Sequence, residues 1–357
     1  MITKNDIISS FNPNAPGLPG RLFGLPFDED HAELIILPVP WEVTVSYNAG
    51  TAEGPAAILN ASNQVDLFLK DIPGAWQMGM YMLPISENLL EENYKSRDLA
   101  FKYISWLEQN DQGWISDDLK VIPRAVDEVC EKLNIYVKSQ ALMYLRQGKM
   151  VGLVGGDHST PLGLIRAVAE TFGSFGILQV DAHADLRQAY EDFRYSHASI
   201  MYNAMQLEQV SKLVQVGVRD YCEEEVEYIN NANGRVVPFF DSDIKAALYQ
   251  GDNWASICHR IVQELPGKVY LSLDIDGLNP TLCPNTGTPV PGGLEFDQVI
   301  YLIKLLVQAK KVIVGFDINE VAPGDNDWDA NVGARLLYNI GSLMGASQGR
   351  LKFIGNL

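Results

Sequence analysis

Residues 175–185 read FGILQVDAHAD, and this stretch decides the fold that we expect. Its first half is apolar apart from one glutamine, which is typical of a strand buried on both faces. Its second half places Asp181, His183 and Asp185 at every second position. Because residues two apart on an extended chain point to the same side, we expect a row of two carboxylates and one imidazole at the carboxyl end of a buried strand.

Similar apolar runs alternate with segments of helical spacing along most of the chain. This alternation indicates an α/β fold of three layers, α-β-α, in which helices cover both faces of a mostly parallel sheet. Because no linker rich in Pro, Gly or Ser divides the sequence, we expect residues 1–357 to form a single domain. The expected strands span residues 33–40, 150–156, 175–181, 212–218, 268–276 and 311–320, and the expected helices span residues 160–171, 296–310 and 332–345, with one more beginning at Gly54.

Two segments depart from this alternation. Residues 1–32 are rich in Gly, Pro and Asn, so we expect an irregular N-terminal arm there. Residues 85–147 contain two long stretches of helical spacing and many charges. We expect them to form an added helical segment within the domain.

The chain carries 45 Asp and Glu against 27 Lys and Arg, a net charge of −18. Nucleic acids and anionic membranes are poor partners for such a surface, because binding phosphates needs clustered cations. A cationic ligand would be attracted instead. The four cysteines are scattered, which favours a reducing compartment. Because we see neither a signal peptide nor an apolar run long enough to span a bilayer, we expect a cytoplasmic protein.

Polar residues directly follow four of the expected strands. Ligands bind beyond the carboxyl ends of the strands in an open parallel sheet, so these residues are candidates for one shared site. They lie in GGDHS (155–159), DAHAD (181–185), LDIDG (273–277) and FDINE (316–320), and the candidates are His158, Asp181, His183, Asp185, Asp274, Asp276 and Glu320.

So many acidic groups cannot converge without compensation, because buried like charges repel and unpaired buried charges are costly. A pair of divalent cations would resolve this conflict. Carboxylates with some imidazole suit manganese, with Zn, Fe, Co or Ni as alternatives. Six ligands are too many for one catalytic ion that keeps an open position. They fit two ions about 3.5–4 Å apart that share carboxylates.

Together these motifs resemble the ureohydrolase (arginase–agmatinase) family. GGDHS, DAHAD and SLDIDGLNPTLCPNTGTPVPGG (272–293) are similar to its three signature segments, and YNAGTAEGP (47–55) is similar to its N-terminal segment. The resemblance covers most of the chain and implies an arginase-like fold with an eight-stranded sheet.

The resemblance also implies the ligand set of a dinuclear site with two divalent ions, Mn²⁺ in the first place and Ni²⁺ as an alternative. Asp181 and Asp274 would bridge the two ions. The other ligands would be His158 and Asp185 for one ion, and His183 and Asp276 for the second.

The implied reaction is hydrolysis of a guanidinium group to urea and an amine. In the family's scheme Asp185 orients the nucleophile and Glu320 receives the guanidinium. His197, in YSHAS (195–199), passes a proton to the leaving amine. The resemblance further implies a homo-oligomer, either a trimer or a hexamer.

The substrate follows from a longer segment, DAHADLRQAYEDFRYSHASIMYN (181–203), which resembles the agmatinase pattern. The negative net charge also suits a dicationic amine, so we favour agmatine as the substrate and polyamine metabolism as the context. Free guanidine, a guanidino acid, arginine and formiminoglutamate stay open as alternatives. The sequence departs from the family pattern at Tyr202 with Asn203, at Asn279, and at Cys283 with Asn285.

Two interpretations from other classes of protein compete with this one. A two-metal phosphoesterase would use similar ligands at strand ends, but it needs cations for the phosphate, and the site segments supply only Arg187. A metal-loaded binding protein without catalysis would need no carboxylate for a guanidinium, whereas Glu320 is present.

Overall fold

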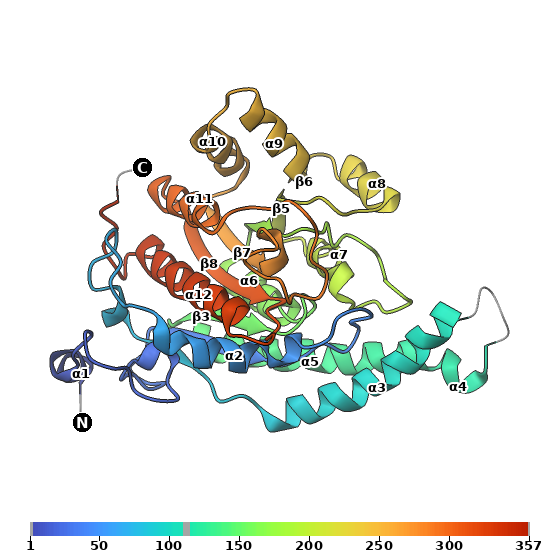
Figure 1. The fold of residues 1–357 in the computed structure, drawn as a ribbon, viewed down its shortest axis with the longest axis horizontal. Coiled ribbons are helices and arrows are strands. Elements are labelled where there is room, and N and C mark those ends of the chain that lie inside the picture. Colours follow the sequence, from blue (N-terminus) through green and yellow to red (C-terminus); the bar gives the residue numbers. More distant parts are fainter. Residues whose placement is uncertain (1–2, 110–114, 356–357) are drawn as a thin grey trace.

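Eight strands form one sheet at the centre of the computed structural model, which describes residues 3–109 and 115–355. They lie in the order β2-β1-β3-β8-β7-β4-β5-β6, and all neighbours in this order are parallel. The expected α/β fold with a mostly parallel, eight-stranded sheet is thus confirmed (Figure 1). The strands are β1 (Leu34–Val39), β2 (Met80–Met82), β3 (Met150–Gly155), β4 (Phe175–Val180), β5 (Val210–Val216), β6 (Val236–Phe239), β7 (Lys268–Asp274) and β8 (Val312–Asn319).

Helices cover both faces of this sheet (Figure 1). In one layer α2, α12, α11 and α10 pack side by side, and in the other α5, α6 and α7 do so. This follows from the parallel sheet, because each connection between parallel strands must cross a face. The bounds are α2 (Gly54–Ala61), α5 (Ile122–Leu145), α6 (Leu162–Phe172), α7 (Ile200–Met205), α8 (Glu223–Asn231), α9 (Asp241–Tyr249), α10 (Trp254–Glu264), α11 (Phe296–Gln308) and α12 (Trp328–Ser347).

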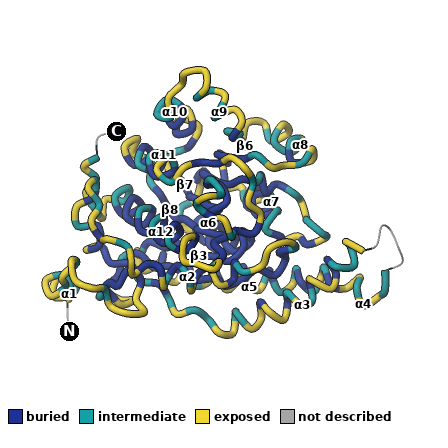
Figure 2. Tube along the Cα trace, viewed as in Figure 1, coloured by how far each residue is buried: buried dark blue, intermediate teal, exposed yellow. Residues whose placement is uncertain are grey.

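The strands at the centre of the sheet are buried along their length (Figure 2). All six residues of β1, of β3 and of β4 are buried. Their apolar side chains alternate between two faces that are both covered by helices, which explains the unbroken apolar runs in the sequence. Within residues 3–109 and 115–355, no helix combines the length and the apolar character needed to cross a bilayer.

Two strands that we did not locate from the sequence lie at the edges of the sheet. β2 has only three residues, and β6 contains Pro238 and is half-buried at three of its four positions. Proline is tolerated at an edge because its missing N–H is not needed on the outer side. Short edge strands of this kind carry a weak periodic signal, so the sequence was least informative there.

The expectation of an irregular N-terminal arm over residues 1–32 was wrong at residues 4–10, whereas residues 11–21 and 25–32 form no helix or strand. Helix α1 (Lys4–Ser10) begins after Thr3, whose hydroxyl accepts the N–H of Asp6 while the carboxylate of Asp6 accepts the N–H of Thr3. Further along the arm, Leu25 and Phe27 are each only 1% exposed and belong to the core. The capping signal and these apolar residues were hidden among turn-forming residues. Residues 1–2 lie outside the described part of the chain.

The added helical segment expected over residues 85–147 is present. It consists of α3 (Glu87–Gln109), the short α4 (Asp117–Lys120) and α5. α5 lies in the layer on the sheet, whereas α3 packs against α5 and extends away from the sheet (Figure 1). Residues 110–114, between α3 and α4, are outside the described residues.

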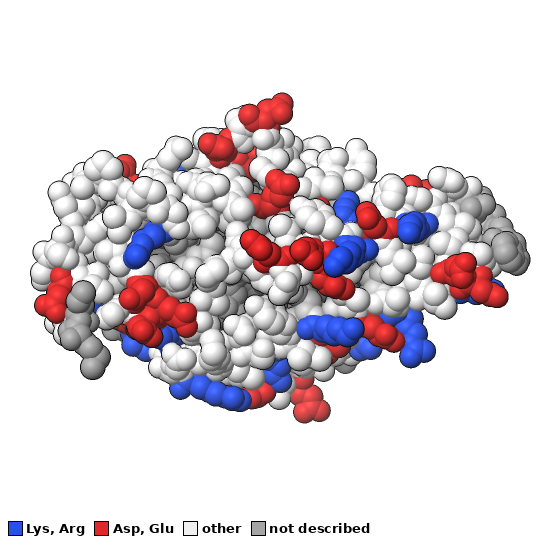
Figure 3. All heavy atoms as spheres, turned by 90° about the horizontal axis from the view of Figure 1, so that it is seen from below, with Lys and Arg blue, Asp and Glu red and all other residues white. Residues whose placement is uncertain are grey.

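Charges of both signs are mixed on the face seen from below, where Lys and Arg are scattered among Asp and Glu (Figure 3). Ion pairs also form between residues one helical turn apart, namely Lys95 with Glu91 on α3 and Arg124 with Glu128 on α5. Exposed pairs of this kind contribute about 0.5 kcal/mol or less each. Packing between α3 and α5 therefore contributes more to holding this segment than its charges do.

Gly156, directly after β3, allows the backbone to pass very close to the loop after β1. A β-carbon on Gly156 would lie 1.9 Å from the carbonyl oxygen of Trp41. We expect Gly156→Ala to lower the free energy of unfolding by about 1–3 kcal/mol, the cost of overpacking, measured as a lower midpoint of urea unfolding. Gly267→Ala is the matched control, because nothing lies within 4 Å of a β-carbon there. Equal midpoints for the two variants would contradict this close approach.

Candidate metal centre and substrate cavity

Four strands that are far apart in the sequence end side by side. The order β3-β8-β7-β4 makes them neighbours, so the residues after them meet at one edge of the sheet. This explains why the candidate residues converge. His158 follows β3, Glu320 follows β8, Asp274 and Asp276 lie at the end of β7, and Asp181, His183 and Asp185 follow β4.

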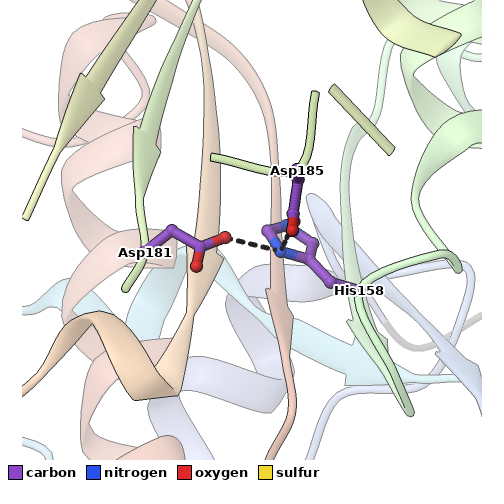
Figure 4. A group of neighbouring side chains, drawn as sticks. All are labelled: His158, Asp181 and Asp185. Carbon is purple, nitrogen blue, oxygen red and sulfur yellow. Dashed lines mark ion pairs between the residues drawn. The ribbon is translucent and has the colours of Figure 1, made fainter. Parts of the chain in front are cut away.

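The first group of possible ligands surrounds the imidazole of His158 (Figure 4). Its Nδ1 lies 3.0 Å from Oδ2 of Asp181 and 3.1 Å from Oδ2 of Asp185. Oδ2 of Asp274 is 3.3 Å away. Although these oxygens are close, the buried Nδ1 makes no well-directed hydrogen bond with any described residue. An imidazole nitrogen and carboxylate oxygens gathered in this way can hold a metal ion.

The second group consists of Asp181, His183 and Asp276. Nδ1 of His183 lies 3.0 Å from Oδ2 of Asp276 and 3.6 Å from Oδ1 of Asp181. Asp181 therefore presents Oδ2 to the first group and Oδ1 to the second. A carboxylate that faces both groups is placed to bridge two ions.

The backbone after β4 does not stay extended as far as Asp185. His183 forms an isolated parallel bridge with Asp220, but Asp185 has a left-handed backbone with a φ of 55°. The carbonyl oxygen of Asp185 accepts the N–H groups of Met201 and Tyr202 in the first turn of α7, which stabilises this uncommon conformation. The expected simple row of three side chains was therefore wrong, and Asp185 reaches the site through a turn.

The end of β7 also turns instead of continuing. A 3-10 turn spans Ile275–Gly277, so the side chains of Asp274 and Asp276 do not point the same way from one extended strand. Oδ1 of Asp274 accepts the N–H of Asp276 at 2.8 Å, and Oδ1 of Asp276 accepts the N–H of Ala182 at 3.0 Å. These bonds fix one oxygen of each carboxylate and leave each Oδ2 beside an imidazole.

Two buried polar residues that sequence reasoning missed support the possible ligands. Oγ of Ser272 lies 2.9 Å from Nε2 of His158 and donates to Oδ1 of Asp317 at 3.0 Å. This contact orients the ring of His158 and leaves its Nδ1 facing the carboxylates. On β4, Nε2 of Gln179 donates to Oδ2 of Asp181 at 2.8 Å. Each supporting residue is a polar residue in an apolar strand, two positions before a carboxylate, and this signal was available in the sequence.

The crowded carboxylates are unfavourable without a cation. Burial raises the pKa of Asp185 to about 7, and the charge of Asp181 adds to this shift. Burial also raises the pKa of Asp274 well above its usual range, together with the charges of Asp276 and Asp181. Divalent cations would offset the repulsion while all the carboxylates stay ionised. The donor set therefore fits a pair of hard divalent ions.

Glu320 lies beside this cluster at the end of β8. Its Oε1 accepts the N–H of His158 at 2.8 Å, and its backbone is left-handed with a φ of 63°. Burial raises the pKa of Glu320 well above its usual range, and the charge of Asp157 adds to it. A β-carbon on Gly287 would lie 3.3 Å from Oε2 of Glu320, so the glycine leaves space beside that oxygen.

A cavity of about 330 Å³ opens onto the site. Its wall includes His183 and Asp185 together with His197, whereas Glu320 is not among the described residues that line it. Burial lowers the pKa of His197 to about 4, with a further contribution from the charges of His183 and His158. The structure thus brings His197 to the same cavity as two of the predicted ligands, His183 and Asp185.

Four further acidic residues are among the residues that line this cavity. They are Glu108, Glu191, Asp220 and Glu225. Arg187 is the one Lys or Arg among the described lining residues, and its Nε lies 4.0 Å from Oε2 of Glu225. Its guanidinium also lies over the ring of Tyr190, 5.0 Å from the ring centroid. Because this single cation is already partnered, the cavity favours a ligand that carries positive charge.

The residues that depart from the family pattern have structural partners. The amide of Asn203 donates to two backbone carbonyl oxygens, and neither Asn203 nor Tyr202 is among the described residues of the cavity wall. The N–H and the side-chain amide of Asn285 each donate to the carboxylate of Asp329 at 2.9 Å. Cys283 is buried. Neither Cys283 nor Asn285 is among the described residues that line the cavity.

Comparisons with known proteins find relatives in sequence and in fold. The N(1)-aminopropylagmatine ureohydrolase of Thermus thermophilus is 30% identical over 334 residues, which cover 91% of this chain and 94% of that protein. The agmatinase of Enterobacter sp. is 30% identical over 300 residues, which cover 84% of this chain and 82% of that protein. The solved structure of the agmatine ureohydrolase of Thermoplasma volcanium has the same fold, with a TM-score of 0.69 at 23% identity over 97% of this chain and 99% of that chain.

The sequence profile of the arginase family matches residues 32–342. This range contains all the strands of the sheet and every candidate residue of the site. The chain therefore belongs to the arginase family.

Proposed function

We propose that this protein hydrolyses the guanidino group of a small cationic substrate to urea and an amine, with agmatine as the favoured substrate. The observation that carries the proposal is a cavity whose wall contains possible metal ligands together with further carboxylates. The names of two relatives, an agmatinase and an N(1)-aminopropylagmatine ureohydrolase, support the same class of substrate.

We propose that two divalent ions occupy the site, Mn²⁺ in the first place and Ni²⁺ as an alternative. Asp181 and Asp274 would bridge them, with His158 and Asp185 on one side. His183 and Asp276 would complete the other side. Such a pair lowers the pKa of a water, so that a nucleophile is available near neutral pH.

The protein's own groups would bind and orient the substrate. Glu320 would receive the guanidinium through paired hydrogen bonds, the arrangement that a carboxylate offers to a planar fork of N–H groups. Asp185 would orient the attacking oxygen. A C–O bond forms at the guanidinium carbon, and the bond from that carbon to the nitrogen that carries the alkyl chain breaks. His197 would pass a proton from the attacking water to this leaving nitrogen. This role is supported by the position of His197, which lines the same cavity as Asp185.

The charge of the cavity discriminates between the alternative substrates. The anionic end of a guanidino acid, of arginine or of formiminoglutamate would meet a wall that contains Glu108 and Glu191. Free guanidine would leave most of the cavity unfilled. A phosphoesterase is disfavoured for the same reason as the acids, since Arg187 is already partnered by Glu225.

We further propose that residues 1–357 form one catalytic domain that assembles as a homo-oligomer, a trimer or a hexamer, in the cytoplasm. The proposal of an oligomer rests on the family resemblance. Light scattering coupled to size-exclusion chromatography measures the assembled mass directly.

Urea release by the purified protein tests the proposed reaction. The protein is loaded separately with Mn²⁺ and Ni²⁺ and supplied with agmatine, N(1)-aminopropylagmatine, arginine, guanidine, 4-guanidinobutyrate and formiminoglutamate. We expect urea from agmatine and N(1)-aminopropylagmatine, which carry an amine in addition to the guanidinium and no carboxylate. Their kcat/KM should be at least about tenfold above that for the carboxylate-bearing compounds, since an unpaired carboxylate in this cavity costs more than about 1.4 kcal/mol. Urea from arginine or guanidine alone, or formamide from formiminoglutamate, would contradict the assignment to agmatine-like substrates.

Asp181 faces both groups of possible ligands, so its loss affects both. We expect Asp181→Ala to lose both ions and to lower kcat at least about a thousandfold, because a catalytic ion contributes several kcal/mol. Metal content is measured by inductively coupled plasma mass spectrometry alongside urea release. Asp98→Ala, on the exposed side of α3, is the control. Two bound ions and near-normal turnover in Asp181→Ala would contradict the proposal that Asp181 bridges two ions.

Glu320 is proposed to bind the substrate without holding a metal. The amide oxygen of Glu320→Gln can still accept the N–H of His158, but the negative charge that pairs with the guanidinium is lost. We expect two ions to remain bound while kcat/KM falls about ten- to a hundredfold, the value of a charge-assisted pair. Full activity of this variant would remove Glu320 from the proposed role.

A further inference from the structure

Helix α3 lies outside the two helical layers, yet it holds a loop that forms the cavity. Oδ1 of Asn93 accepts the N–H of Glu42 at 2.7 Å, and Nη1 of Arg97 donates to the carbonyl oxygen of Glu42 at 2.6 Å. Asn93 is fully buried. These bonds hold the loop after β1, whose Ser46 and Tyr47 line the cavity.

The same helix holds a second loop of the cavity. The hydroxyl of Tyr103 donates to Oδ2 of Asp192 at 2.5 Å, and its ring packs edge-on against Phe193 with the centroids 5.8 Å apart. Glu191 and Asp192 both have left-handed backbones, with φ of 51° and 63°. Because residues other than glycine seldom adopt this conformation, the contacts with α3 help to hold the turn that places Glu191 in the cavity wall.

The last turn of α3 brings a second carboxylate to this wall. Glu108 lines the cavity together with Glu191, and its negative charge acts on Glu191. Oε2 of Glu191 is buried and accepts no hydrogen bond from the described residues. Burial raises the pKa of Glu191 to about 7, a shift that Ser46 opposes and Glu108 increases. A buried carboxylate oxygen without a donor, beside a second carboxylate, is relieved by a bound cation.

We propose that Glu108 and Glu191 bind an ammonium group at the far end of the substrate, and that helix α3 thereby sets the selectivity of the cavity. The proposal rests on the proposed hydrolysis of guanidino compounds in the same cavity, whose wall also contains His183 and Asp185. The ligand class is a guanidine joined by an alkyl chain to an ammonium group. α3 contributes one of the two carboxylates and positions the loop that carries the other.

Two substrates of nearly equal size separate ammonium binding from general damage to the cavity. Agmatine carries the ammonium group, and pentylguanidine carries a methyl group in its place. Urea release from both is measured for the wild type, Glu108→Gln, Glu191→Gln and the double variant, all loaded with Mn²⁺. Binding of agmatine is measured independently by calorimetry. Glu92→Gln, an exposed residue of the same helix, is the control for removing one negative charge from α3.

We expect each single variant to raise the KM and the Kd for agmatine about tenfold, the effect of one charge-assisted hydrogen bond. The double variant should raise both constants further. The kcat for agmatine and the kcat/KM for pentylguanidine should stay within about twofold of the wild type, as should all constants of Glu92→Gln. Unchanged affinity for agmatine, or an equal loss for pentylguanidine, would overturn the proposal.

Calorimetry keeps this test separate from that of the reaction itself. If the wild type releases no urea but binds agmatine in a manner that depends on Glu108 and Glu191, the ammonium site stands and the proposed hydrolysis fails. If the wild type hydrolyses guanidines with no preference for agmatine over pentylguanidine, the hydrolysis stands and the ammonium site fails. If the wild type neither binds nor hydrolyses agmatine, both proposals fail.

Discussion

The crowding of buried carboxylates around two imidazoles is the constraint on which the rest of this structure depends. Asp181, Asp185 and Asp274 all lie within 3.3 Å of one nitrogen of His158. Such a cluster is costly without compensating cations. The fold tolerates it because β3, β8, β7 and β4 end side by side. The N–H of Asp276 and the hydroxyl of Ser272 occupy an oxygen of Asp274 and a nitrogen of His158 that face away from the centre, and Gln179 donates to the oxygen of Asp181 that faces His158.

The wall of the cavity is built by different parts of the chain. His183 and Asp185 follow β4, a strand that the sheet holds in a fixed position, as catalytic groups require. Glu108 comes from α3, which packs against α5 and lies outside the two helical layers. The proposed ammonium site is therefore carried by other elements than the possible metal ligands.

Much of the fold was predictable because its signals are local. The apolar runs of β1, β3, β4, β5, β7 and β8 marked the strands, and the polar residues after four of them marked the site. The short edge strands β2 and β6 and the capped helix α1 were missed, since each carries few residues of any periodic pattern. The sequence predicted that Asp185 reaches the cluster from an extended strand, whereas its side chain arrives through a left-handed turn that depends on α7.

By itself the sequence determined the class of fold, the set of possible ligands and the sign of the charge that the protein attracts, because apolar periodicity and side-chain chemistry are properties of short segments. Only the tertiary structure decided that β8 and β7 lie between β3 and β4, that Asp181 faces both groups of ligands, and that Glu108 and Glu191 share one cavity. These are contacts between residues distant in the chain, and they depend on how helices and strands pack rather than on any local pattern.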